Sequence, residues 1–176
     1  MRTLQPASYT ALDLNRAAVA FCRRTHNVPG VDFINGDAEK LPFPDNAFDV
    51  VINIESSGAY PNSSRFRAEV ERVLRPGGHF LYADLRPRNK IPVWEAALAS
   101  APMQMVSRED INAQVLHGMQ DNTPRMLDLI GRMPVYLRHI GREFCGVKDT
   151  KFYRALQSGE YSYRMYCFVC YGRAVS

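Results

Sequence analysis

Short apolar segments alternate with amphipathic segments through the first half of the chain. Runs rich in apolar and β-branched residues predict strands, and apolar residues at helical spacing predict helices between them. This alternation predicts βαβ units around a parallel sheet, and therefore the α/β fold class. Phe48–Ile54 is apolar enough to be buried on both faces of that sheet. The predicted elements are strands at Tyr9–Leu14, Val31–Asn35, Phe48–Ile54 and His79–Leu85, a helix capped by Asn15 that runs to Thr25, and a helix from Ser64 that the Pro76-Gly77-Gly78 turn ends.

The second half is predominantly helical by the same criteria. Trp94–Met105 and Ser107–Gln120 predict two helices, the second because Ser107 to Asp110 resembles a capping box. A third helix ends near Pro134, and Tyr163–Tyr171 predicts a terminal strand. We therefore divide the chain into a βαβ part at residues 1–88, a helical part at residues 89–145 and C-terminal strands at residues 146–176.

Composition adds a broad class. The chain has 176 residues, 46% of them apolar and 23% charged, which is typical of one globular domain. No apolar run reaches the roughly 18 residues of a membrane span, and the N-terminus lacks the apolar stretch of a secretory signal. We expect a cytoplasmic protein.

The net charge of +4 is a mild excess of basic residues. Six basic side chains gather between Arg132 and Arg154, where only Glu143 and Asp149 are acidic. Such a run is typical of a solvated face, and it is too weak to predict binding to nucleic acid. It is equally compatible with attraction to an acidic substrate and with peripheral contact to anionic lipid at the inner face of a membrane.

Cys167 and Cys170 form a CxxC motif within the predicted terminal strand. Side chains three residues apart on a strand point to opposite faces, so the two thiols would diverge. No second pair or histidine stands at ligand spacing nearby. We interpret both cysteines as small apolar residues and predict no metal site.

An acidic residue follows each of the first three predicted strands: Asp13, Asp37 and Glu55. Ligands of open α/β sheets bind beyond the carboxyl ends of the strands, so these acids could line one crevice. An acid after the first strand can accept hydrogen bonds from ribose hydroxyls, and Asp37 is placed to accept one from an adenine amino group.

Three blocks of sequence make the chain recognisable: ALDLN, GDAEKLPF followed by FDVV, and RVLRPGG. With these blocks the chain resembles the class I S-adenosylmethionine-dependent methyltransferases. It is most similar to the phthiotriol/phenolphthiotriol dimycocerosates methyltransferases of envelope-lipid synthesis, and this likeness continues through WEAALA, SREDINAQVLHGM, GREFCGVKDT and GEYSYRMYCF. The resemblance implies a Rossmann-like sheet with a helical lid, an S-adenosylmethionine cofactor, and methyl transfer to a hydroxyl of a lipid or glycolipid.

The resemblance also implies roles for individual residues. Asp13 would bind the ribose, Leu14 would pack on the adenine, and Asp37 would hold the adenine amine. Ala38, in the Gly36-Asp37-Ala38 segment, would contribute backbone contacts, and Glu55 would lie near the methionine moiety.

The catalytic base is not identified by the sequence. Relatives tend to carry a histidine in the loop after the FDVV strand, where this chain has Gly58, which cannot act as a base. His117 and His139 in the predicted lid are the alternatives, and His26 and His79 have structural explanations.

The resemblance places the family's first strand and its glycine-rich loop before Met1. That strand is central in the family's sheet, so its absence would leave two strand edges unpaired. Residues 1–176 would then be one incomplete methyltransferase domain that binds the cofactor weakly or not at all. Two further explanations stay open: a catalytically silent remnant or binding partner, and a misassigned start codon. Oligomeric state is not predicted.

Overall fold

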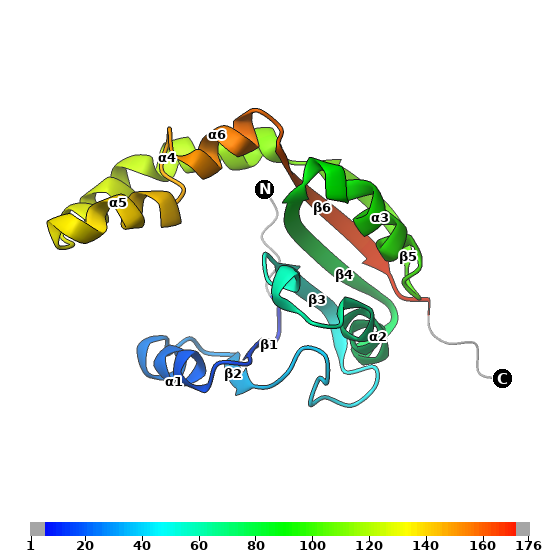
Figure 1. Cartoon of the computed structure of the whole chain (residues 1–176). Coiled ribbons are helices and arrows are strands. Elements are labelled where there is room, and N and C mark those ends of the chain that lie inside the picture. The colour runs from blue at the N-terminus through cyan, green and yellow to red at the C-terminus, as the bar shows by residue number, and fades with distance from the viewer. Residues whose placement is uncertain (1–5, 172–176) are drawn as a thin grey trace.

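The computed structural model describes residues 6–171 and places their strands in two separate sheets (Figure 1). A two-stranded parallel sheet pairs β1 with β2, and a four-stranded sheet has the order β3-β4-β6-β5. Within the described residues no pairing joins β1 to β3. Among these strands, β1 and β3 each have one edge to which no other strand pairs. The strands are β1 (Tyr9–Asp13), β2 (Val31–Asn35), β3 (Phe48–Ile54), β4 (Leu74–Pro87), β5 (Gln104–Asp110) and β6 (Tyr161–Val169).

The first unit, β1–α1–β2, follows the sequence prediction closely. Helix α1 (Arg16–Thr25) begins after Asn15, whose side chain accepts hydrogen bonds from the backbone N–H groups of Ala17 and Ala18 at 2.9 and 3.2 Å. The helix ends at His26. Only Val19 of this helix is buried, so the unit contributes little to the main core.

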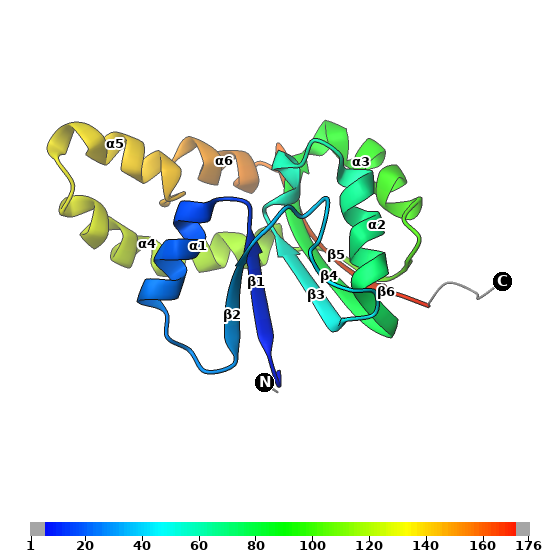
Figure 2. The same ribbon diagram turned by 90° about the horizontal axis from the view of Figure 1, so that it is seen from below.

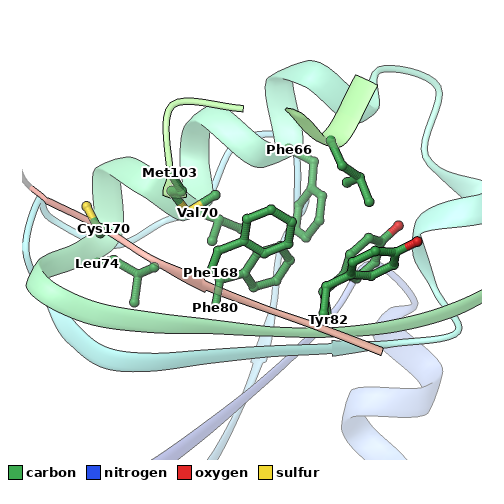
Figure 3. Close-up of a cluster of buried hydrophobic side chains, with 10 residues drawn as sticks. Phe66, Val70, Leu74, Phe80, Tyr82, Met103, Phe168 and Cys170 are labelled. Atoms are coloured by element: carbon green, nitrogen blue, oxygen red, sulfur yellow. The ribbon is translucent and has the colours of Figure 1, made fainter. Parts of the chain in front are cut away.

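The second unit, β3–α2–β4, supplies most of the core. Helix α2 (Ser63–Val73) is capped by Asn62, which accepts a hydrogen bond from the N–H of Arg65 at 3.0 Å. Its apolar residues lie on one face because they recur at helical spacing. That face packs on one side of the four-stranded sheet, where aromatic side chains of β4 and β6 meet it (Figure 3). The core residues are Phe66, Val70, Leu74, Phe80, Tyr82, Leu98, Met103, Tyr166, Phe168 and Cys170.

The opposite side of this sheet is open, and here one prediction is wrong. Phe48–Ile54 was expected to be buried on both faces, but Val50, Ile52 and Ile54 are exposed, Ile54 by 61%. Leu81 of β4 is also exposed on the sheet. The reason is that α2 and α3 (Ile91–Ala99) cover only one face in the described part of the chain (Figure 1).

The second half departs further from the prediction. The segment from Ser107 is not the start of a helix: residues 104–110 form β5, which pairs antiparallel with β6. The helix that follows, α4, begins at Asn112 and runs unbroken to Gly131 with Pro124 inside it. The predicted C-terminal part contains a helix, α6 (Lys151–Gln157), and one strand.

Helices α4, α5 (Val135–Phe144) and α6 form an arm that extends away from the four-stranded sheet (Figures 1 and 2). The division at residues 88 and 145 stays a prediction, but β5 shows that residues 89–145 are not wholly helical. Among residues 6–171 no helix is both long and apolar enough to cross a membrane.

Candidate active site

The carboxyl ends of β1 and β2 hold Asp13 and Asp37 close together. The two strands run parallel with Asp13 opposite Asn35. The Asn35 amide donates to the carbonyl oxygens of Asp13 and Leu14 at 3.0 and 2.9 Å. The N–H of Gly36 donates to the same Asp13 carbonyl at 3.1 Å. These bonds fix the turn after β1 against the turn after β2, so Asp13, Leu14, Gly36 and Asp37 form one group.

Each carboxylate uses one oxygen for its own turn. Asp13 Oδ1 accepts from the N–H of Asn15 at 2.7 Å, and Asp37 Oδ1 accepts from the N–H of Glu39 at 2.8 Å. The second oxygen of each carboxylate has no hydrogen-bond partner among the described residues. Leu14, 72% exposed, lies beside them. Two free acceptors next to an apolar side chain suit a ligand with hydroxyl or amino donors and an aromatic ring.

Gly36 and Ala38 have packing roles. A Cβ on Gly36 would lie 2.8 Å from Leu12 Cδ1 and 3.3 Å from the Pro42 ring, so a larger residue would force these two side chains to shift. Ala38 is partly buried and packs against the main core. The contacts of both residues are therefore made within the protein and involve no ligand.

Arg72 anchors the loop that carries Asp37 to the second unit. Its guanidinium donates to the carbonyl oxygens of Phe43 and Leu41 at 2.8 and 3.0 Å, and to Asp45 at 2.8 Å. The Glu69 carboxylate completes the set at 2.8 Å. The hydrogen bond to Glu69, and to a lesser extent the one to Asp45, raise the pKa of Arg72 above its ordinary value. The guanidinium of Arg72 therefore stays charged.

Glu55 lies at the carboxyl end of β3, at the same end of the molecule as Asp13 but in the other sheet (Figure 2). Its backbone is in the left-handed region, with φ of 56°. Its N–H donates to the carbonyl of Ala83 at 2.9 Å, and Oε1 accepts from the Tyr163 hydroxyl at 2.7 Å. Burial, and then this bond, raise the pKa of Tyr163, so it stays a donor to Glu55. The structure thus fixes Glu55 but does not bring it into contact with the Asp13 group.

A buried polar cluster that the sequence did not predict lies beyond Glu55. Ser57, in a short 3₁₀ turn (Ser57–Ala59), donates to Asp84 Oδ2 at 2.5 Å and accepts from the Tyr82 hydroxyl. Arg86 donates to Ser57 Oγ at 3.0 Å and lies 3.0 Å from Asp84 Oδ1. Burial raises the pKa of Tyr82, which keeps its proton available to Ser57. The sequence does contain a sign of this cluster: Tyr82, Asp84 and Arg86 stand at every second position of β4, so their side chains share one face of the strand.

The histidines do not supply a base at this site. His117 lies on α4, exposed, 3.7 Å from Asp121, and His139 is exposed on α5. Within residues 6–171 neither contacts Asp13, Asp37 or Glu55. Gly58 lies at the buried cluster, where a Cβ would be 3.6 Å from Arg86 Nη1. The catalytic residue therefore stays unassigned.

Comparison with known proteins identifies similar sequences and folds. Residues 1–82 match a methyltransferase domain family. The chain is 56% identical over 168 residues to the phthiotriol/phenolphthiotriol dimycocerosates methyltransferase of Mycobacterium tuberculosis (strain H37Ra), covering 95% of this chain and 62% of that protein. It is 49% identical to the fatty-acid O-methyltransferase of Mycolicibacterium smegmatis, covering 96% of this chain and 61% of that protein. The chain thus spans about three fifths of the length of these curated relatives.

Solved structures support the fold. Geranyl diphosphate methyltransferase in complex with S-adenosylmethionine matches with a TM-score of 0.60 and 14% identity, over 93% of this chain and 69% of that chain. The cyclase SpnF matches with a TM-score of 0.66 and 20% identity, over 92% of this chain and 66% of that chain. The likeness to these structures shows that the chain has the fold of the class I S-adenosylmethionine-dependent methyltransferases, and its sequence is similar to methyltransferases over most of its length.

Proposed function

We propose that this protein is an O-methyltransferase that acts on a hydroxyl of an envelope lipid of the phthiotriol/phenolphthiotriol dimycocerosate type. The observation that carries the proposal is the 56% identity to an enzyme of that name over 95% of the chain. Identity at this level over almost the whole described fold extends beyond the cofactor half into β5, the arm and β6.

The Asp13 group would hold S-adenosylmethionine, which supplies the methyl group. The free oxygen of Asp13 would accept from the ribose hydroxyls and that of Asp37 from the adenine amine, with Leu14 against the ring. Ala38 would offer its backbone, and Gly36 would keep the turn close to β1. Glu55, held by Tyr163, would face the methionine end.

Cofactor binding by the chain alone is expected to be weak. In the described residues, no strand lies between β1 and β3 in space, and so no glycine-rich loop follows one at that position. Few backbone N–H groups are therefore available to bind the methionine carboxylate. Isothermal titration with S-adenosylmethionine tests this expectation, and micromolar affinity would contradict it.

The methyl-transfer proposal is tested on the chain fused to the part of the M. tuberculosis relative that it does not match. We expect transfer of a labelled methyl group to a phthiotriol-type lipid. Asp13→Ala should weaken cofactor binding by about tenfold or more, since one charged acceptor is lost. Asp32→Ala, an exposed aspartate within β2, is the matched control. A fusion that binds the cofactor but methylates no lipid hydroxyl would overturn the proposal.

We further propose a cytoplasmic location with the arm in contact with the inner face of the membrane. Helix α5 exposes Tyr136, Ile140 and Phe144, which are four residues apart and so share one face. Arg132 and Arg142 are close to this stripe in the sequence, and Arg142 lies on the opposite face of the same helix. An apolar face with basic residues on the polar face is typical of helices that lie in an anionic lipid surface.

A further inference from the structure

A cavity of about 310 Å³ lies above the buried polar cluster, outside the Asp13 group. It starts at Ser57, two residues beyond Glu55, and extends between the start of α2 and one face of α3. No residue that we assigned to the cofactor lines it. Its lining residues are Ser57, Gly58, Tyr60, Ser63, Tyr82, Arg86, Lys90, Val93, Trp94 and Ala97.

The charged residues of the lining are both cationic. Arg86 and Lys90 face the cavity, and no carboxylate belongs to its wall. Asp84 lies beneath, only 2% exposed, with its oxygens bonded to Ser57, Arg86 and the N–H of Leu85. Lys90 forms no ion pair among the described residues. One positive charge therefore remains uncompensated at this cavity.

Arg86 also has donors to spare. Nη1 donates to the carbonyl of Leu85 at 2.6 Å and faces Asp84, and Nη2 donates once to Ser57. A guanidinium carries five N–H groups, so Nε and the second N–H of Nη2 have no partner in the described chain. The bonds that Arg86 does form hold it in place, with its Cζ 4.7 Å from the centre of the Trp94 ring. A fixed guanidinium with free N–H groups is suited to a carboxylate.

The remaining wall is apolar. Val93, Trp94 and Ala97 follow one another along α3, and Tyr82 and Tyr60 close the opposite side. Val93 is 71% exposed, so the apolar wall continues onto the surface of the molecule. A ligand that fits both parts has an anionic head at Arg86 and Lys90 and a hydrocarbon chain along α3.

We propose that this cavity binds a free fatty acid, with its carboxylate at Arg86 and Lys90. The inference goes beyond the proposed function, because the fatty acid is a second ligand, distinct from the hydroxyl-bearing lipid that accepts the methyl group. It also gives Lys90 a role in choosing between charged and neutral lipids, because Lys90 is the cation with no partner of its own.

The single tryptophan of the chain makes the proposal testable without any methylation assay, because Trp94 lies in the cavity wall. Dodecanoate should change the Trp94 fluorescence in a saturable way. Dodecan-1-ol, with the same chain length and no charge, should bind at least about tenfold more weakly. Lys90→Gln should weaken dodecanoate binding by about tenfold and leave dodecan-1-ol binding unchanged.

Lys148→Gln is the matched control, because Lys148 is exposed and belongs to the arm rather than the cavity. Equal affinity for acid and alcohol, or no effect of Lys90→Gln, would overturn the proposal. Tighter binding of dodecyl phosphate than of dodecanoate would also overturn it and would reassign the head group to a phosphate. The titration contains no S-adenosylmethionine, so a failure of the proposed methyl transfer would leave its outcome unaffected.

Discussion

Asp84 is the residue on which the buried polar cluster depends. It is almost fully buried, and its charge is balanced by Arg86 and by the donors of Ser57 and Leu85. Asp84→Ala should lower the free energy of unfolding by about 3 kcal/mol, because it leaves the Arg86 charge without its partner. Asp128→Ala, which removes an exposed pair with Arg132, should cost about 0.5 kcal/mol. Urea denaturation of both variants measures the difference, and similar costs would contradict the assignment.

Two glycines provide an internal comparison of close packing and open space. Gly36→Ala should destabilise the protein by about 1–2 kcal/mol, since the new methyl group would press on Leu12 and the rigid Pro42 ring. Gly118→Ala, inside α4 with no atom within 4 Å of the new Cβ, should stabilise it by about 0.5–1 kcal/mol. Thermal unfolding of both variants tests the prediction. A stabilised Gly36→Ala would show that the turn after β2 is not constrained.

For individual residues, the sequence predicts the place in the fold better than it predicts which side chains are in contact. Asp13 and Asp37 could be located because each follows a strand, and parallel strands end at the same edge. The bonds of Ser57 to Asp84 and Arg86 could not, because they depend on how β3 and β4 align. Nothing in the local sequence of either strand determines that alignment.

At the scale of elements, β5 is the main error of prediction, and its cause is visible. Ser107 to Asp110 resembles the start of a helix, but the segment gains backbone partners from β6 along Gln104–Asp110. The helix signal is real and lies further on: Asp110 Oδ1 accepts from the N–H of Asn112, where α4 begins. Pairing with β6 therefore outweighs the local helix preference of Ser107 to Asp110, and the helix begins a few residues later than predicted.

Helix α5 gives a prediction about membranes. Phe144 is 91% exposed at the end of its apolar stripe. Phe144→Ser should reduce partitioning onto phosphatidylglycerol vesicles by about tenfold, since burial of an aromatic side chain in lipid is lost. Val28→Ser, an exposed apolar residue outside the arm, should have no effect. Co-sedimentation measures both, and equal loss in the two variants would rule out the arm as the contact.

For the whole molecule, the β1–α1–β2 unit should open independently of the rest. Among residues 6–35 only Val19 is buried, whereas β4 and β6 line the main core. Backbone amides of β1 and β2 should therefore be at least about 100-fold less protected from hydrogen exchange than those of β4 and β6. Mass spectrometry of exchanged peptides tests this. Equal protection would show that the loop anchored by Arg72 couples the two units into one.

The overall architecture was predictable because it depends on alternation: strand, helix, strand. The resemblance also predicted the break between β1 and β3. The exposure of Val50, Ile52 and Ile54 was not predictable, because an apolar strand carries no sign of whether a second layer covers it.

The free edges of β1 and β3 have a consequence for assembly. They belong to different strands, so β1 of one molecule can pair with β3 of another, and that contact leaves a new β1 and a new β3 edge at the two ends. Contacts of this head-to-tail kind do not close on themselves unless the rotation happens to form a ring. Light scattering should therefore rise with concentration without reaching a fixed mass. Ile52→Lys, which places a charge on the exposed face of β3, should suppress the rise. A stable dimer at all concentrations would contradict this mode of growth, by which the molecule would extend into an open fibre.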